Sequence, residues 1–367
     1  MKLSSLGLLV GGLLSAGASH ASGSTYAFVK LDALSGANSS AVAINNAGQI
    51  VGSSAANGGR DYHAALWKNG IVTDLGTAGG LNSQAYAINN LGQVSGASSI
   101  VNNPNYQAVS WGGAAPVQLP SLGGSTSFAM GVNDLGQHAG YSFTAGDFAT
   151  HAARWQGGVA TDLGTLGGFD SYGHAINSAG VVAGAASTAD DAFHAARWDG
   201  NTAIDLGTLG GTNSWAYAIN NTGSIAGYAN TAGDAATRAV IWNGASILAL
   251  STQGWLNSSA YGLNSSGIAV GSAWNVTGAG HAMLWQGNTM IDLNQYLDSN
   301  TLGAGWVLRQ ANGINDSGAI VGDAYNTITG QTNGFLLSAV PEPEQGLMLL
   351  AGLAWLAVRG RRRRRAA

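Results

Sequence analysis

Histidine, aspartate and serine recur at fixed intervals along this sequence, and these side chains serve metal sites and nucleophilic catalysis. Each type keeps one position in a repeat of about 44 residues. The histidines are His63, His151, His194 and His281, and the aspartates are Asp74, Asp162, Asp205 and Asp292. The serines are Ser39, Ser83, Ser127, Ser171, Ser214 and Ser258. One copy per repeat spaces such residues too widely to share one metal ion at ligand distances of about 2 Å. We therefore interpret the histidines as strand packing, the aspartates as turn caps and the serines as structural hydroxyls.

Calcium is an alternative that the acidic loops leave open. Asp190 and Asp191, with Asp147 or Asp234, supply carboxylates of the kind that Ca²⁺ prefers. No loop has the ligand spacing of an EF-hand, so we expect no metal or other cofactor as the main interpretation.

Positions at which the repeats differ are better candidates for a ligand site. Three residues before a repeated Asn stand Val42, Tyr86, Met130, His174, Tyr217, Tyr261 and Asn312. If the first strand of each repeat lines a central channel, Tyr86, His174, Tyr217 and Tyr261 form a shallow surface suited to sugars. Packing between repeats is the competing interpretation, and the alternating isoleucines of the same strand favour it. A second candidate is the longer segment before the last repeat, with Tyr296 and Trp306, because irregular loops often carry function.

The channel positions contain one histidine and no acid, which argues against an enzyme. Hydrolysis of a polymer needs two carboxylates, or an acid and a histidine, that converge. There is no Cys in the chain, and the only glutamates follow Val340. We therefore predict a non-enzymatic protein.

Two independent markers define the repeats. An apolar residue followed by Asn, two variable residues and Gly begins at Asn45, Asn89, Asn133, Asn177, Asn220, Asn264 and Asn315. A tryptophan keeps the same step at Trp67, Trp111, Trp155, Trp198, Trp242 and Trp285, and Phe335 takes the seventh position. Many of the 57 glycines thus mark turns that are copied once per repeat.

Each repeat reads as four short strands, which is the size of a β-propeller blade. In the second repeat we expect strands at 84–88, 93–97, 106–111 and 115–119, with a type I turn from Asn89 to Gly92. The segment 26–34 fits the fourth-strand position, whereas the last repeat supplies only three strands, at 311–315, 319–324 and 334–340. The sequence therefore predicts an all-β, seven-bladed propeller closed by the N-terminal strand. An open β-solenoid is the alternative, but it would gain nothing from this split blade.

Both ends read as targeting segments, so we expect three parts: 1–21, 22–340 and 341–367. Lys2, an apolar run and Ser19-His20-Ala21 predict a secretory signal peptide, removed by signal peptidase. At the other end, Pro341-Glu342-Pro343 precedes an apolar segment and then Arg361, Arg362, Arg363, Arg364 and Arg365. Thirteen apolar residues would span about 20 Å as a helix, less than a bilayer core of about 30 Å. This length suits transient membrane insertion, and a plain tail anchor is the alternative.

The net charge of −4 hides an acidic body. Half of the 14 basic residues lie in the two end segments, whereas all but two of the 18 acids lie between them. An acidic surface gives no electrostatic support for nucleic-acid binding.

Two resemblances follow from these motifs. The C-terminal Pro-Glu-Pro, hydrophobic helix and Arg cluster resemble the PEP-CTERM sorting signal of Gram-negative bacteria. That resemblance implies cleavage near Pro341 to Pro343 by an exosortase and release or attachment at the cell surface. The segments His-Ala-x-x-Trp, Asp-Leu-Gly-Thr-Leu-Gly-Gly and Ala-Ile-Asn-x-x-Gly resemble the "probable extracellular repeat, HAF family" proteins, which implies an exported β-repeat protein without a known catalytic set.

The function expected from these features is that of an exported, non-enzymatic surface or matrix protein that contacts exopolysaccharide. A propeller hydrolase or lyase acting on extracellular polymer is one alternative, and a scaffold for protein partners is another.

Overall fold

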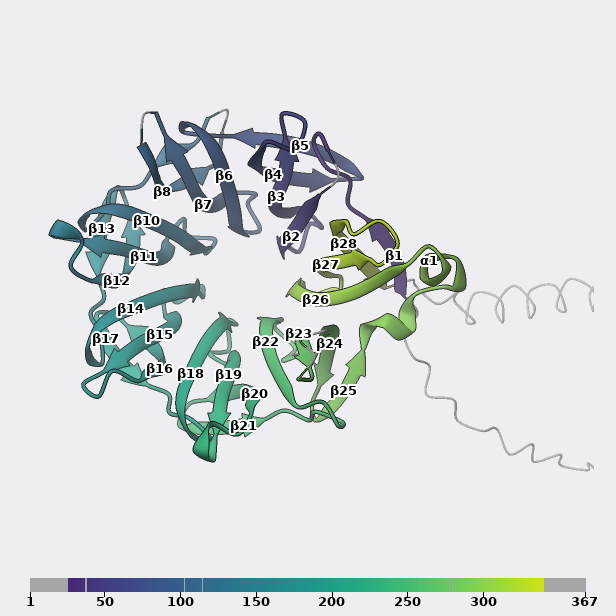
Figure 1. Cartoon of the computed structure of the whole chain (residues 1–367). Coiled ribbons are helices and arrows are strands. Elements are labelled where there is room, and N and C mark those ends of the chain that lie inside the picture. Colours follow the sequence, from purple (N-terminus) through teal and green to yellow (C-terminus); the bar gives the residue numbers. More distant parts are fainter. Residues whose placement is uncertain are drawn as a thin grey trace, which may run out of the picture. The chain divides into compact units, whose positions relative to one another are not determined.

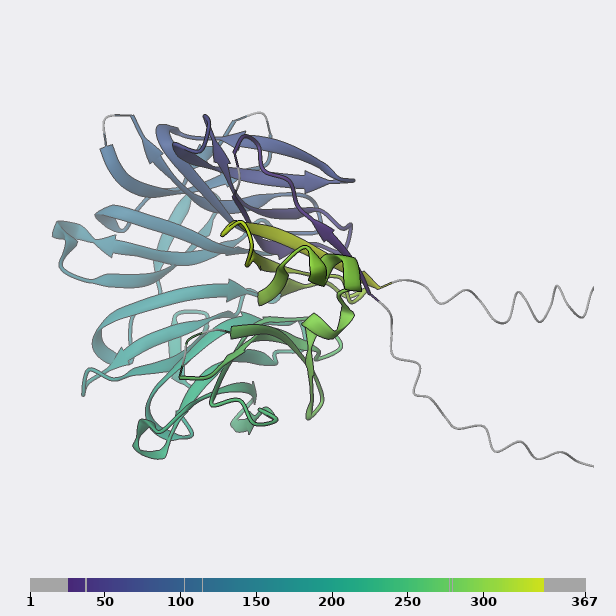
Figure 2. The ribbon, with the colours of Figure 1, turned by 45° about the vertical axis from the view of Figure 1, so that its right-hand side comes forward.

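Seven four-stranded antiparallel sheets surround a central channel in the computed structural model, which describes residues 26–339 except 37, 102, 114, 277 and 279 (Figure 1). The first strand of each sheet lies nearest the channel, and consecutive sheets pack face to face (Figure 2). The predicted seven-bladed propeller is confirmed. Because the last sheet has the order β1-β28-β27-β26, the N-terminal strand closes the ring and the solenoid alternative is wrong.

The blades are numbered here by their order in the chain. Blade 1 comprises β2 (Ser39–Ile44), β3 (Ile50–Ala56), β4 (Asp61–Lys68) and β5 (Ile71–Gly76). Blade 2 comprises β6 (Gly79–Ile88), β7 (Val94–Ile100), β8 (Asn103–Trp111) and β9 (Val117–Gln118). Blade 3 comprises β10 (Gly123–Val132), β11 (His138–Thr144), β12 (Thr150–Gln156) and β13 (Val159–Asp162), with the 3₁₀ turn η1 (Ala145–Asp147) after β11. Blade 4 comprises β14 (Gly167–Ile176), β15 (Val182–Thr188), β16 (Phe193–Asp199) and β17 (Thr202–Asp205).

The remaining blades follow the same plan. Blade 5 comprises β18 (Gly210–Ile219), β19 (Ile225–Thr231), β20 (Thr237–Asn243) and β21 (Ser246–Ala249), with η2 (Ala232–Asp234) after β19. Blade 6 comprises β22 (Asn257–Leu263), β23 (Ala269–Trp274), β24 (Gly280–Gln286) and β25 (Thr289–Asp292). Blade 7 comprises β26 (Trp306–Ile314), β27 (Ile320–Asn326), β28 (Thr332–Ala339) and β1 (Tyr26–Lys30). The segment between β25 and β26 forms η3 (Leu293–Tyr296) and the short helix α1 (Ser299–Gly303).

The first strands are longer than the sequence predicts, because the Gly-Gly pair before them belongs to the strand. β6, β10, β14 and β18 all begin at such a pair. A second glycine position, in the second strand of each blade, allows close contact with the first strand. A Cβ atom at Gly184 would lie 1.8 Å from the carbonyl oxygen of Tyr172, so a side chain there would force the strands apart.

The repeated Asn closes the turn between the first two strands of each blade, as predicted. In blade 2 the Gly92 N–H donates to the Asn89 carbonyl oxygen at 3.1 Å, and Gly92 has φ 82°. The Asn89 side-chain oxygen accepts the N–H groups of Leu91 (3.1 Å) and Gln93 (2.8 Å). The turn therefore uses both the backbone and the side chain of one residue, which is why Asn recurs.

The same side chains also join the blades into a ring. Each Asn Nδ2 donates to the carbonyl oxygen of the equivalent Asn in the next blade. The donors, in order with their distances, are Asn45 (3.0 Å), Asn89 (2.9 Å), Asn133 (2.9 Å), Asn177 (3.4 Å), Asn220 (3.1 Å), Asn264 (3.3 Å) and Asn315 (3.1 Å). Asn315 of blade 7 donates to the Asn45 carbonyl oxygen of blade 1, so these hydrogen bonds form a closed ring.

The repeated serines form a second set of contacts between blades. The Ala152 N–H donates to Ser171 Oγ in the next blade at 2.8 Å, and Ala195 bonds Ser214 in the same way. At the junction of the last and first blades, the Gly334 N–H donates to Ser39 Oγ at 3.1 Å. These buried hydroxyls are structural, in agreement with the sequence interpretation.

Closure of the ring also buries apolar side chains of the N-terminal segment. β1 pairs with β28 from Tyr26↔Ala339 to Lys30↔Phe335. Leu31 then packs into a cluster with Trp67 and Val321, which belong to blades 1 and 7. Phe335 is fully buried in the position that tryptophan occupies in the other repeats.

The loss of one ring asparagine should destabilise the whole propeller. Asn133→Ala removes the buried bond to Asn177 and the acceptor of two partly buried turn N–H groups, and should cost about 2–4 kcal/mol of unfolding free energy. Leu135→Ala, in the same turn but with an exposed side chain, is the matched control and should change stability by less than about 0.5 kcal/mol. Denaturant unfolding of both variants measures the difference. Equal stabilities would contradict a structural role for the asparagine ring.

Candidate functional site

The central channel is the main cavity that the predicted ligand residues share. Its wider part has a volume of about 560 Å³. The residues three positions before each ring asparagine line it, as predicted: Val42, Tyr86, Met130, His174, Tyr217, Tyr261 and Asn312. The structure thus brings Tyr86, His174, Tyr217 and Tyr261 to one cavity.

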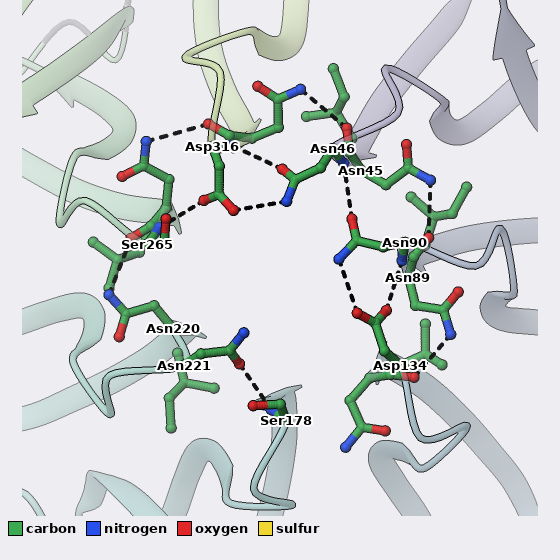
Figure 3. A pocket seen from close by; sticks show the side chains of 18 of the residues that line it. Asn45, Asn46, Asn89, Asn90, Asp134, Ser178, Asn220, Asn221, Ser265 and Asp316 are labelled. Carbon is green, nitrogen blue, oxygen red and sulfur yellow. Dashed lines mark hydrogen bonds between the residues drawn. The ribbon is translucent and has the colours of Figure 1, made fainter.

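A polar opening forms one end of the channel (Figure 3). The residue after each ring asparagine projects there: Asn46, Asn90, Asp134, Ser178, Asn221, Ser265 and Asp316. Their side chains bond from blade to blade. Asn90 donates from its N–H and from Nδ2 to the two carboxylate oxygens of Asp134, at 2.8 and 3.0 Å. The Asp316 carboxylate accepts from Asn46 Nδ2 (2.7 Å) and from the Ser265 N–H (2.9 Å), and these bonds hold its pKa below the usual range.

Seven aliphatic side chains separate this opening from the tyrosines. Ile44, Ile88, Val132, Ile176, Ile219, Leu263 and Ile314 line both cavities. These side chains form an apolar collar in the channel. Each lies two residues after a tyrosine position, on the same face of the first strand. Both interpretations hold in part: the tyrosine positions line the cavity, and their rings also pack between blades, as Tyr217 does on Tyr261 at 5.2 Å.

Burial in the channel wall keeps His174 neutral. It lowers the pKa of this imidazole to about 4. The ring lies against Trp215 (5.7 Å between centroids) and Tyr217 (5.3 Å), and Nε2 has no hydrogen-bond partner. Burial also raises the pKa values of Tyr86 and Tyr217, so both phenols stay protonated as hydrogen-bond donors.

Asp323 is a channel residue that the sequence interpretation missed. It lies on β27 rather than on a first strand, and its carboxylate reaches the cavity beside Ser40 and Asn312. Asn312 Nδ2 donates to Oδ2 at 3.1 Å, whereas Oδ1 has no partner. Burial raises the pKa of Asp323. The expectation of a channel without acids is therefore wrong. The available signal was that Asp323 is the one acid at its repeat position, where the other repeats have Ser, Ala or Tyr.

A row of aromatic rings extends from the channel across the face of blades 2 to 6. Tyr86 and Tyr106 contact Phe128, which contacts Tyr141 at 5.0 Å. The row continues through Tyr172, Trp215, Tyr217 and Tyr261, each ring contacting the next within 5.1 to 5.7 Å or through His174. The stretch from blade 2 to blade 6 is therefore lined with aromatic faces and phenol groups, the surface on which sugar rings pack.

The repeated histidines and aspartates bond to each other, which the sequence interpretation did not foresee. His63, His151, His194 and His281 each place Nδ1 2.6–2.8 Å from Oδ2 of Asp74, Asp162, Asp205 and Asp292, respectively. The other carboxylate oxygen caps the turn; Asp162 Oδ1, for example, accepts the Gly164 N–H at 2.8 Å. The predicted turn cap is confirmed. The histidine contacts the carboxylate that caps the turn.

Exchanges between repeats support this structural role. In blade 2 both partners are replaced, and Gln118 Nε2 donates to Gln107 Oε1 at 3.4 Å. In blade 5 the pair is Arg238 and Ala249, and Arg238 bonds the Leu256 carbonyl oxygen instead. The two positions change together, which a strand-to-strand contact requires and a shared metal ion does not explain.

The acidic turns offered for calcium lie in separate blades. Asp147 Oδ1 accepts the Ser125 N–H (2.7 Å), and Asp234 accepts both the N–H and the hydroxyl of Thr212. Asp147, Asp191 and Asp234 all have positive φ, the backbone of a tight turn. Among the residues that the structure describes, no three His, Asp or Glu side chains gather as metal ligands.

Tyr296 and Trp306 pack against the closing strand. The Tyr296 ring lies 4.7 Å from Tyr26, and the Trp306 ring lies 6.3 Å from Phe28. Neither residue lines the channel. We assign both to ring closure; binding of a ligand by this segment stays a prediction.

The predicted targeting segments, 1–21 and 341–367, lie outside the described residues, as do Pro341, Glu342, Pro343, Arg361, Arg362 and Arg363. Within 26–339, less the gaps given above, no helix is long and apolar enough to cross a membrane.

Comparison with solved structures finds similarities of low sequence identity. No family model and no curated protein matches the sequence. The β-propeller domain of the Trilobed protease from Pyrococcus furiosus is similar at 10% identity and a TM-score of 0.48, covering 71% of this chain and 85% of that chain. The SapL1 lectin in complex with alpha methyl fucoside is similar at 13% identity and a TM-score of 0.36, covering 85% and 99%. A mutant of the Aleuria aurantia lectin in complex with Fucalpha1-6GlcNAc has 12% identity and a TM-score of 0.34, covering 83% and 97%. The seven four-stranded sheets of the structure themselves establish the propeller fold of this chain.

Two buried histidines should make the propeller sensitive to acid. Burial lowers the pKa values of His138 and His174 to about 4, whereas the unfolded chain protonates near pH 6.5. Stability is therefore fully present above about pH 6.5 and is lost as the pH falls towards 4, by up to about 3 kcal/mol per histidine. The double variant His138→Val, His174→Met places at each position a residue that other repeats use, and its stability should fall less steeply over this range. Unfolding curves at pH 7, 5.5 and 4 compare the slopes; parallel curves would rule out the histidines as the cause.

Proposed function

We propose that this protein is an exported, non-enzymatic propeller of the cell surface or extracellular matrix that binds neutral polysaccharide. The observation that carries the proposal is the aromatic row from Tyr86 to Tyr261 along the channel and across the adjoining face. Aromatic faces pack on the C–H faces of sugars, while phenol, amide and hydroxyl groups supply hydrogen bonds. His174 is neutral at physiological pH and the body is acidic, so charge gives no support for an anionic polymer.

Export is the second element of the proposal. The N-terminal signal peptide supports secretion, and the resemblance to a PEP-CTERM segment supports cleavage by an exosortase in a Gram-negative cell. Resemblance to HAF-family repeat proteins agrees with an extracellular location.

Removal of one channel aromatic should weaken polysaccharide binding. We expect Tyr217→Ala and Tyr261→Ala each to lower the affinity about tenfold, because an aromatic contact is worth about 1 kcal/mol or slightly more. Affinity electrophoresis in gels containing dextran or galactomannan measures this, with alginate as the anionic comparison. Phe148→Ala, an exposed aromatic away from the channel, is the control and should bind as wild type. Retention in none of the neutral gels, or only in alginate, would contradict the proposal.

A hydrolase or lyase is the competing function, and Asp323 is the observation in its favour. A carboxyl with a raised pKa and a free oxygen in a cavity suits a general acid. However, no second carboxylate is among the described residues of the wider channel, and His174 lies on blade 4 whereas Asp323 lies on blade 7. We therefore expect no catalysis.

Incubation with the same neutral polysaccharides tests this point. Wild type and Asp323→Asn should release reducing ends at the same background rate. Release by wild type that Asp323→Asn abolishes would show an enzyme and overturn the non-enzymatic proposal. The matched binding gels verify that the variant still engages the polymer.

A further inference from the structure

A second cavity opens between blades 5 and 6, on the side of the aromatic row. Its volume is about 470 Å³, in the range of pockets that hold small ligands. The lining from blade 5 is Asn213, Trp215, Tyr217, Tyr228, Asn230 and Thr237, and the lining from blade 6 is Ser259, Tyr261 and Trp274. Four strands, β18, β19, β22 and β23, supply most of these side chains (Figure 1).

The equivalent space between the preceding blades is filled by one aromatic ring from the first strand. Phe128 of blade 3 contacts Tyr86 and Tyr106 of blade 2. Tyr172, in the same repeat position, contacts Tyr141 of blade 3. Trp215 contacts Tyr172 and Phe193 of blade 4 at 5.6 and 5.4 Å. Each ring therefore covers the aromatic residues of the blade before it.

Blades 3 to 5 carry this ring. At the same repeat position blade 6 has Ser259, and blades 1, 2 and 7 have Ser40, Gln84 and Gln310. A serine is too short to cover Trp215 and Tyr228, and the cavity lies where a ring would otherwise pack. The Ser259 hydroxyl is buried, with 2% of the residue exposed, and has no hydrogen-bond partner. A buried hydroxyl without a partner costs free energy unless something in the cavity bonds to it.

Trp274 is a second departure at the same place. The other repeats have Ala55, Ser99, Phe143, Ser187, Asn230 and Tyr325 at its position. Here the indole forms part of the wall shared by this cavity and the neighbouring one towards blade 7. Blade 6 therefore lacks the first-strand ring of blades 3 to 5, and it contributes the Trp274 ring to the cavity wall.

We propose that the cavity between blades 5 and 6 is a specific subsite for one neutral pyranose unit. This inference rests on the proposed function and identifies a place and a sugar class for it. Trp215, Trp274 and the tyrosines offer apolar faces, while the Ser259 hydroxyl offers a hydrogen bond that nothing else satisfies. No Asp, Glu, Lys or Arg is among the residues that line the cavity, so a neutral sugar fits and a uronic acid would lose its hydration without a counter-charge.

Closing the cavity with the protein's own side chain gives a sharp test. Ser259→Trp copies blade 5, so the variant should fold, and the new ring should fill the space. Calorimetric titration with the methyl glycosides of glucose, galactose, mannose and fucose should show binding of at least one to wild type, lowered at least tenfold in Ser259→Trp. Trp274→Ala should also lower it at least tenfold without adding bulk, which keeps the test valid if Ser259→Trp folds poorly. Phe148→Ala should bind as wild type.

The outcomes separate this inference from the broader proposal. If neutral polysaccharide binds but both blade 6 variants bind it and the glycosides as well as wild type, the subsite is wrong and the proposed function stands. If the polysaccharide binds but no methyl glycoside does, the single-sugar subsite is wrong. Equal binding of galacturonate would overturn the choice of a neutral sugar. Failure to bind any neutral carbohydrate would overturn both.

Discussion

The hydrogen bond from one asparagine amide to the next asparagine carbonyl holds this propeller at its channel. The bond is repeated seven times and returns to its start, from Asn315 to Asn45. Because these side chains are buried, each must find partners for its oxygen and its amide, and the turn and the neighbouring blade provide them. The requirement fixes the turn, its positive-φ glycine and the register of adjacent blades together. The buried serines add a parallel set of bonds further out, as Gly334 shows with Ser39.

A ring held by repeated polar contacts leaves other positions free to vary. The asparagines, present in all seven repeats, and the serines, present in six, form hydrogen bonds from blade to blade. The His–Asp pairs belong to the same class, since Gln107 and Gln118 replace both partners at once and still bond. In contrast, Asp323 and Trp274 are each the one residue of their type at their repeat position, and Ser259 shares its type only with Ser40. Asp323 and Ser259 line the two cavities, and each has a buried side-chain oxygen without a hydrogen-bond partner. Function in such a repeat protein is therefore sought in the exceptions.

Much of the fold was predictable because the same turn and strand pattern occurs seven times in the sequence. The step of the Asn and Trp markers predicted the blade number, and the missing fourth strand predicted the closure through β1. The same reasoning placed Tyr86, His174, Tyr217 and Tyr261 in the channel. It did not reveal that Tyr296 and Trp306 pack against the closing strand, because their contacts are with Tyr26 and Phe28, residues at the far end of the sequence. The histidine–aspartate bond was missed because neither partner shows it alone.

The sequence by itself determined the architecture, since turn chemistry, strand alternation and repeat length are local properties written in consecutive residues. It also determined which positions face the channel. Tertiary structure alone decided where the cavities are. A cavity depends on the side chains that several blades bring together: Asp323 reaches the channel beside Ser40 of the next blade, and the space at Ser259 exists because Trp215 and Trp274 flank it. Such volumes arise from differences between neighbouring repeats, which no single repeat contains.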